Sequence, residues 1–432
     1  MSFEIVSTWL PVSDLKSSET DATLCKMTIK IDGKNVTAFK DDRGSVSHEI
    51  EIPSFYLAEW IAENWWPLLW EPRKTEDGDD SADFISRHSF LAAQHGFALP
   101  RVSIVPTGRS VQVSASSRNV EIADVRFLHG GSTAMPRESV ESELRTFVSS
   151  VVDRLTEARF QETYLQDAWQ LISETGPDEV QFCQFAGALG LSPYDISDGM
   201  AALIDRLLPT LGERLLMDLC LASPASTFST TALLAEKAVS LTKDASISTL
   251  APLNSLSAPK DNVSLPAHRR GVQAAQVLRR KFGIKETDVQ GASRIFDMLH
   301  VDTGFRVQQM PKNEDEVSIT GAVVRDESEM RVALLQAAET KRRFTGARAI
   351  FSAWSSETDN ESRLLTSALT RDQQANRAFA AELTAPLALI RARAPKRVLT
   401  QNALYDLAGD LKIGLDVIKN QALNNGLQVS PT

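Results

Sequence analysis

Histidine and cysteine are the side chains that most often bind transition metals or act as nucleophiles, and this chain contains few of either. The pair His48-Glu49 begins like an HExxH zinc motif, but no second histidine follows at the required spacing. The histidines are His48, His88, His95, His129, His268 and His300. We therefore interpret them as ordinary surface or core residues, and we predict no metal ion and no other cofactor.

The three cysteines lie far apart in the chain, and none belongs to a CxxC or Cys/His pair. They are Cys25, Cys183 and Cys220. This pattern supports neither a disulfide framework nor a zinc knuckle, so we predict buried free thiols in a reducing compartment. The chain also lacks the nucleophile-elbow, Walker and dinucleotide-binding glycine motifs. The motifs therefore predict no catalytic residue.

The bulk composition is that of a soluble globular protein of two or three domains, with 432 residues, 43% hydrophobic and 24% charged. The net charge of −10 argues against broad binding to nucleic acid or to an anionic membrane. The first residues lack the basic and apolar regions of a signal peptide, and no run of 18 apolar residues occurs. We therefore predict a cytoplasmic protein without membrane contact.

Strand patterns dominate the first 135 residues. Residues 27–39 alternate in polarity around Asp32-Gly33, and residues 101–114 alternate around Gly108, so each segment predicts a β-hairpin. Residues 120–128 predict a further strand.

An aromatic segment, residues 55–70, separates the two predicted hairpins and holds four of the seven tryptophans. Its apolar residues fall at helical spacing, and Pro67 is predicted to end the helix. We interpret the segment as a helix that packs tryptophan onto the sheet. The alternative is an aromatic partner-binding surface formed by Trp60, Trp65 and Trp66.

Helical periodicity begins near residue 136 and continues to residue 242. The next segment, residues 243–266, is rich in Ser, Pro, Asn and Asp and predicts a linker. Strands are expected after it over residues 305–309, 317–324 and 332–335. Helices are expected over residues 267–282, 293–299, 341–354, 371–393, 401–410 and 416–424.

The C-terminal region resembles the ImmA/IrrE family of metallopeptidase-like proteins over about residues 264–430. The segments that carry the resemblance are GVQAAQVLRRKFGI (271–284), ITGAVV (319–324), RFTGA (343–347), NRAFAAELTAP (376–386) and LYDLAGDLKIGLDVIKNQALNNGL (404–427). Together, the patterns and the resemblance predict an α+β fold. Its parts are a β-rich domain (1–135), a helical domain (136–242), a linker (243–266) and a mostly helical, zincin-like domain with a small sheet (267–432).

The chemistry of this family requires HExxH on a helix, where two histidines one turn apart bind Zn²⁺ and the glutamate acts on the bound water. The aligned residues here are Arg348, Ala349 and Ser352, and Gln374 stands where the family has its third ligand. Arginine cannot ligate zinc, and its fixed charge repels the ion. The resemblance therefore implies a scaffold with a degenerate metal site.

Our leading hypothesis is a non-catalytic pseudo-peptidase that binds a protein or peptide partner, in bacterial or phage-related regulation, stress response or defence. The former substrate groove would form the binding surface through Arg343, Arg348, Asn376 and Glu382. The first alternative is a metal-dependent peptidase with ligands recruited from outside the degenerate motif. The second is a DNA-associated regulator, because residues 267–282 form a basic helix and residues 404–424 have helix-turn-helix-like spacing.

Overall fold

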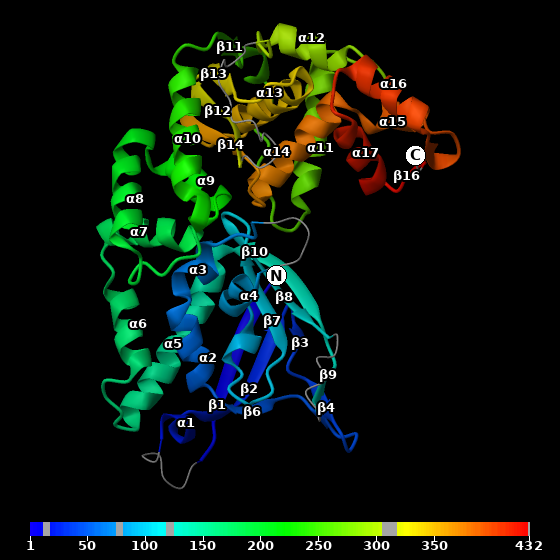
Figure 1. Ribbon diagram of the computed structural model, residues 1–432. Coiled ribbons are helices and arrows are strands. Elements are labelled where there is room, and N and C mark those ends of the chain that lie inside the picture. The colour runs from blue at the N-terminus through cyan, green and yellow to red at the C-terminus, as the bar shows by residue number, and fades with distance from the viewer. Residues whose placement is uncertain (12–17, 75–80, 118–124, 305–317, 431–432) are drawn as a thin grey trace. The chain divides into compact units, whose positions relative to one another are not determined.

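The computed structural model describes residues 1–11, 18–74, 81–117, 125–304 and 318–430 (Figure 1). The chain has an α+β fold, as the sequence predicts, and divides into two compact units, Met1–Ile204 and Asp205–Thr432. None of the helices in the described residues is long and apolar enough to cross a membrane.

The first unit contains three small sheets of short strands. In one sheet β2 (Leu24–Ile31) pairs with β1 (Phe3–Trp9), β3 (Lys34–Asn35) and β6 (Ile50–Pro53). In the second, β8 (Ser110–Ser116) lies between β7 (Arg101–Pro106) and β10 (Gly131–Pro136). The third joins β4 (Phe39–Asp41), β5 (Val46–Ser47) and β9 (Val125–Phe127).

Both predicted hairpins are confirmed. Asp32 and Gly33 both have positive φ, as a two-residue hairpin turn between β2 and β3 requires. Gly108, with φ of 98°, lies in the turn between β7 and β8. Of the further predicted strand, residues 125–127 form β9, and residues 120–124 lie outside the described residues.

The tryptophan segment forms two helices instead of the single predicted one, α2 (Phe55–Glu63) and α3 (Trp65–Trp70). Pro67 does not end a helix as predicted. It lies in the first turn of α3, where a backbone N–H has no intrahelical partner to lose. Trp60, Trp65 and Trp66 are all buried in the core of this unit. The aromatic partner-binding surface is therefore wrong, because these rings already pack against the sheet and against neighbouring helices.

Helices complete the first unit, and α5 packs on β1 while α2 packs on α5 and α6. The helices are α1 (Glu19–Ala22), α4 (Ala82–His88), α5 (Arg137–Glu157), α6 (Tyr164–Glu174) and α7 (Pro177–Ala188), with the short 3₁₀ helix η1 (Phe90–Ala93). Helix α8 (Asp198–Leu211) begins in the first unit and ends in the second.

The second unit is built on a four-stranded antiparallel sheet in the order β11-β13-β12-β14. The strands are β11 (Ile247–Thr249), β12 (Ile319–Asp326), β13 (Glu329–Leu334) and β14 (Asn360–Thr366). Helices α9 (Glu213–Ala222) and α10 (Phe228–Thr242) pack on this sheet, as does α13 (Glu339–Trp354) (Figure 1). Strand β14 lies at one edge of this sheet.

The remaining helices of the second unit extend from α13. Helix α14 (Arg371–Thr384) packs on α13, and α11 (Ala267–Lys281) packs along α14. The others are α12 (Gly291–Met298), α15 (Leu387–Ala392), α16 (Gln401–Leu411) and α17 (Leu415–Asn424), with short elements η2 (Ala225–Thr227), η3 (Ala251–Leu253), η5 (Pro395–Arg397), β15 (Val398–Leu399) and β16 (Gln428–Val429).

The segment predicted as a linker, residues 243–266, takes part in this unit. Its strand β11 pairs with β13, and Leu250 and Leu253 are buried in the same apolar core as α13. Helices α9 and α10, predicted to belong to a separate helical domain, also lie in this unit. Short apolar stretches inside a polar segment do not reveal their sheet partner in sequence, because the partner strand comes some 80 residues later.

The single helix predicted over residues 371–393 is broken into α14 and α15, because Pro386 follows α14 closely and has no N–H to continue it. The strand predicted over residues 305–309 lies outside the described residues.

Candidate functional site: the Arg348 cage and the charge network

Arg348 lies in the middle of α13 and is 4% exposed. Its guanidinium group crosses to the edge strand β14 and to α14, and every partner found for it is neutral. Nε donates to Asn376 Oδ1 at 2.7 Å, Nη1 to the Thr320 hydroxyl at 3.1 Å, and Nη2 to both Thr366 O and Gln373 Oε1 at 2.6 Å. We call Arg348 and these four residues the Arg348 cage.

The cage is held by further hydrogen bonds among its own members and the backbone. The Asn376 amide donates back to Arg348 O at 3.0 Å, and Gln373 Nε2 donates to Leu364 O at 3.0 Å. Burial lowers the pKa of the Arg348 guanidinium, and the nearby charge of Arg377 adds to the lowering. A guanidinium keeps its proton in proteins, so the cage contains a buried cation that is solvated by oxygen dipoles.

Two cage residues and Asp218 close part of the free edge of β14. Three side chains from three helices satisfy backbone groups there. Asp218 of α9 accepts from Leu364 N at 3.0 Å, Gln373 of α14 donates to Leu364 O, and Arg348 of α13 donates to Thr366 O. An extended peptide adds to a sheet through such edge groups. Strand addition at residues 364–366 is therefore blocked by the chain itself.

The sequence alignment placed Gln374 in the region of the third metal ligand, but the structure brings Gln373 to Arg348 instead. Gln374 is exposed, and its amide donates to Leu369 O at 3.2 Å. Neighbouring helix positions point about 100° apart, so a one-residue offset moves a side chain from the inside to the outside of α14.

The two other aligned positions lie on α13 beside Arg348. Ala349 is fully buried, and its methyl group belongs to the apolar core of the second unit. Ser352 is buried one turn after Arg348, and its carbonyl oxygen accepts from the Ser356 hydroxyl at 2.9 Å. A glutamate at position 349 would therefore face apolar side chains.

The residues assigned to the former groove are buried, which contradicts their role as an open binding surface. Arg343 donates to the Ser293 hydroxyl at 3.0 Å, and burial lowers its pKa. Glu382 accepts from Leu387 N at 3.3 Å and from the Gln421 amide at 2.8 Å, and burial raises its pKa. Arg348 and Asn376 are both in the cage. These side chains lie inside the fold and do not form an open binding surface.

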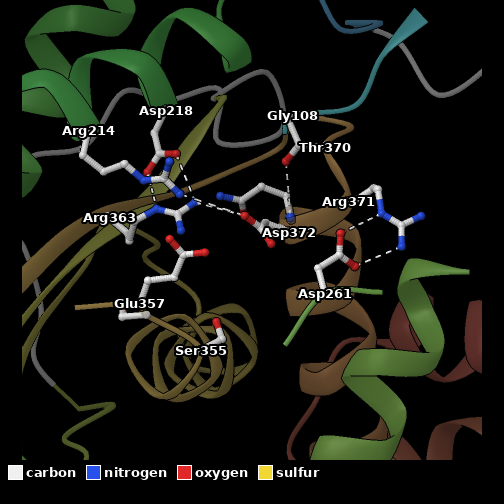
Figure 2. A network of polar contacts seen from close by, with 12 residues as sticks. Gly108, Arg214, Asp218, Asp261, Ser355, Glu357, Arg363, Thr370, Arg371 and Asp372 are labelled. Carbon is white, nitrogen blue, oxygen red and sulfur yellow. Dashed lines mark hydrogen bonds and ion pairs between the residues drawn. The ribbon is translucent and has the colours of Figure 1, made fainter. Parts of the chain in front are cut away.

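A second polar group, which the sequence analysis missed, lies on the same edge strand. We call it the charge network: Arg214, Asp218, Arg270, Glu361, Arg363 and Asp372. Figure 2 shows Arg214, Asp218, Arg363 and Asp372 pointing toward one another. The three acids balance the three arginines.

Arg363 of β14 and Asp218 of α9 form the centre of the charge network. Arg363 donates to both carboxylate oxygens of Asp218, at 2.9 and 3.2 Å, and both side chains are buried. Burial alone would lower the pKa of Arg363, but Asp218, followed by Asp372 and Glu361, raises it above its ordinary value. This bidentate pair fixes α9 to the edge of the sheet.

Asp372, in the first turn of α14, connects the network to α11. Arg270 donates to its carboxylate at 2.6 Å, and Arg363 lies 3.9 Å from it. Burial opposes ionisation of Asp372, but Arg363 and Arg270 outweigh this and lower its pKa to about 2. The carboxylate is therefore charged at neutral pH.

Gly271 explains how α11 can approach α14 closely enough for these contacts. A Cβ atom at this position would collide with the backbone oxygen of Ala375 and the backbone nitrogen of Phe379. The two helices therefore touch backbone to backbone where Gly271 of α11 meets Ala375 of α14. Ala375 lies two residues from Gln373 and one from Asn376.

The first unit has its own buried charge cluster, which no sequence motif indicated. Glu71 accepts from Arg87 Nε and Nη2, both at 2.8 Å, and lies 3.1 Å from His88 Nε2. His88 Nδ1 lies 2.7 Å from Ile104 O. Burial opposes ionisation of Glu71, but His88 and Arg87 lower its pKa to about 2. Both ring nitrogens of His88 face acceptors, so this cluster stabilises a structure and presents no free base.

The described residues contain no group of three or more His, Cys, Asp or Glu side chains placed to hold a metal ion. The three cysteines are free and buried, as predicted. Comparisons with protein-family models, with curated proteins and with solved structures gave no match to this chain.

Proposed function

We propose that this chain is a non-catalytic, metallopeptidase-like protein that acts by binding a protein or peptide partner. The observation that carries the proposal is the Arg348 cage. The position aligned with the first zinc ligand holds a buried guanidinium whose three nitrogens all donate, to Asn376, Thr320, Thr366 and Gln373. A metal ion at this place would meet a fixed positive charge and donors in place of lone pairs.

The closed edge of β14 supports the same proposal. A peptidase that holds its substrate as an added strand needs free edge groups, and here Asp218, Gln373 and Arg348 occupy them. The partner would therefore bind to another part of the surface.

The proposed setting is bacterial or phage-related regulation, stress response or defence, and it rests on the resemblance to the ImmA/IrrE family. We also propose a cytoplasmic location, because the three cysteines are free thiols and disulfides are rare in that compartment.

Elemental analysis of the purified chain tests the proposal. We expect only trace zinc in the native protein and no cleavage of a denatured protein substrate. Zinc in near-equal amount to the chain would overturn the proposal and favour a peptidase with recruited ligands.

A rebuilt site tests the geometry behind this proposal. The variant Arg348→His/Ser352→His/Gln373→Glu places two histidines one turn apart and a carboxylate where Gln373 meets Arg348. We leave Ala349 unchanged because a glutamate there would be buried among apolar side chains. The matched control carries Gln374→Glu instead of Gln373→Glu. We expect tight zinc binding only in the first variant, and equal binding by both would contradict the placement of Gln373.

A further inference from the structure

The second unit contains a helix-turn-helix near its C-terminal end. Helices α16 and α17 are joined by three residues, Lys412, Ile413 and Gly414. Lys412 lies in the left-handed region, with φ of 52° and ψ of 49°, so the chain leaves α16 in a tight turn. Ile413 is buried, which fixes the turn against the two helices. A turn of this length is typical of the helix-turn-helix motif, whose second helix enters the major groove of DNA.

One face of α17 is used for packing. Ile418 and Ala422 are buried in an apolar cluster that α15 and α16 complete. These three helices lie next to one another in Figure 1. The Gln421 amide donates to Glu382 of α14 at 2.8 Å, so α17 is also fixed to the rest of the unit. The opposite face of α17 is therefore held in place by packing behind it.

This opposite face of α17 is exposed and mostly polar. Its residues are Asp416, Lys419, Asn420, Leu423 and Asn424, which follow helical spacing. In the major groove, lysine donates to guanine, asparagine bonds both polar atoms of the adenine edge, and aspartate accepts from cytosine. An apolar side chain contacts the methyl group of thymine. The exposed face of α17 therefore presents side chains of the types that read base edges.

The segment around α17 is basic, unlike the chain as a whole. Residues 387–430 contain six lysines and arginines and three aspartates, whereas the net charge of the chain is −10. Lys412 is exposed in the turn before α17, and Arg397 Nη2 donates to a carbonyl oxygen just beyond the C-terminal end of α17 at 3.1 Å. One of the aspartates, Asp410, is paired with Arg393 at 3.6 Å. Cations at both ends of a recognition helix suit the phosphate backbones that flank the major groove.

The same face is poorly suited to a protein partner. Leu423 is the one apolar side chain among its five residues. The centre of a protein–protein interface is rich in aromatic and other apolar side chains and poor in charged ones. A face with one leucine among charged and amide side chains therefore favours the edges of base pairs over the surface of a protein.

We propose that α16 and α17 bind double-stranded DNA, with α17 in the major groove. Lys419, Asn420 and Asn424 contact base edges, and the cations at the two ends of α17 contact phosphates. Because these cations are few, most of the affinity comes from the base contacts, so binding is specific for a sequence. The inference goes beyond the proposed function and does not depend on it, since the helix pair shares no residue with the Arg348 cage.

A selection experiment on the full chain tests this inference. The immobilised chain is incubated at about 50 mM salt with duplexes that contain a random stretch of about 20 base pairs, and the bound DNA is sequenced after successive rounds. We expect one sequence motif to become enriched. No enrichment over the resin without protein would overturn the inference and favour a protein as the ligand of this face.

Fluorescence anisotropy with the enriched duplex tests the placement of α17. Asn420→Ala should weaken binding about fivefold or more and relax the preference at one base pair. Lys412→Asn removes a charge and keeps a residue type that tolerates the left-handed conformation. It should weaken binding to all duplexes alike and make the dependence of log Kd on log salt concentration shallower by about one. Unchanged binding in both variants would overturn the inference.

Matched controls lie outside the helix pair. Gln273→Ala removes an exposed amide from α11, and Lys260→Asn removes an exposed lysine, so both should leave binding unchanged. The comparison ligand is a single strand of the enriched sequence, which has no major groove and should bind much more weakly. Equal binding of the single strand, or equal losses in the control variants, would overturn the inference.

Discussion

Two arginines reach the same edge strand of the second unit, and the protein stabilises them in opposite ways. Arg363 is buried against the carboxylate of Asp218, with Asp372 and Glu361 nearby, and its pKa is raised. Arg348 is buried among amide, hydroxyl and carbonyl oxygens, and its pKa is lowered. The first cation is neutralised, whereas the second is only solvated.

The difference indicates what each residue contributes. The charge of Arg363 is its main contribution, because its ion pair with Asp218 holds α9 to β14. Arg348 needs its shape, because a planar group with several N–H donors joins β12, β14 and α14 at once. A residue that serves as a hydrogen-bonding hub is poorly suited to bind either a metal ion or an anionic partner.

The largest effect is expected from Asp218→Asn, which leaves the buried Arg363 without its main counter-charge. We expect a loss of about 3–5 kcal/mol in the free energy of unfolding, measured with urea. The control is Glu236→Gln, because Glu236 pairs with Arg206 at 2.7 Å on the surface of the same unit. That variant should cost much less, because solvent screens an exposed pair. Equal losses for the two variants would remove the distinction between a buried and an exposed pair.

Substitution by lysine or by methionine should show whether the charge or the shape of each arginine side chain contributes more to stability. At position 363, lysine keeps the charge, so Arg363→Lys should be less destabilising than Arg363→Met. At position 348, lysine keeps a buried charge but cannot reach all four acceptors. Arg348→Lys should therefore cost at least as much as Arg348→Met, with losses of about 1–3 kcal/mol. The same rank order at both positions would show that the two sites do not differ as described.

The packing of α11 on α14 should set how well the cage is formed. Gly271→Ala pushes the two backbones apart and should cost about 1–3 kcal/mol. Gly409 of α16 has no atom within 4 Å of an added Cβ, so Gly409→Ala is the matched control and should stabilise the protein by up to about 1 kcal/mol. If Gly271→Ala causes no loss of stability, the close approach of the two helices is not needed for the site.

Lowering the pH should reduce the stability contributed by the charge network and leave that of the Arg348 cage unchanged. This is the smallest of the four expected effects on stability. The pKa of Asp372 is lowered from 3.8 to about 2, so its contribution to stability is present above pH 3.8 and is lost as the pH falls toward 2. The effect is modest because the Asp372 side chain is 33% exposed and solvent screens its charge.

Urea unfolding at pH 5 and at lower pH tests this expectation. Asp372→Asn should lose less stability on acidification than the native chain, because the titrating carboxylate is gone. Arg348→Met should show the native acid dependence, because none of the cage residues is an acid. An altered acid profile in Arg348→Met would mean that the two sites are coupled.

Residue types and spacing were enough to predict the two hairpins, the helix near residues 341–354 and the absence of an HExxH motif on that helix. Asp32-Gly33 predicts its hairpin because few other pairs tolerate two positive φ angles, and the apolar spacing of residues 341–354 predicts a helix close to the observed α13. That Arg348 and Ser352 cannot act as the histidine pair of an HExxH motif is clear from residue types alone, since neither is a histidine-like zinc ligand.

The neighbours of Arg348 and the partner of Arg363 could not be predicted from sequence, because they depend on how the helices pack on the sheet. Gln373 and Gln374 are the same residue type side by side, and only the rotation of α14 against α13 selects the first. Asp218 precedes Arg363 by 145 residues, so their pairing depends on how α9 docks on the sheet. Local sequence specifies backbone periodicity, but the partner of a buried charge is fixed by packing between segments that are distant in the chain.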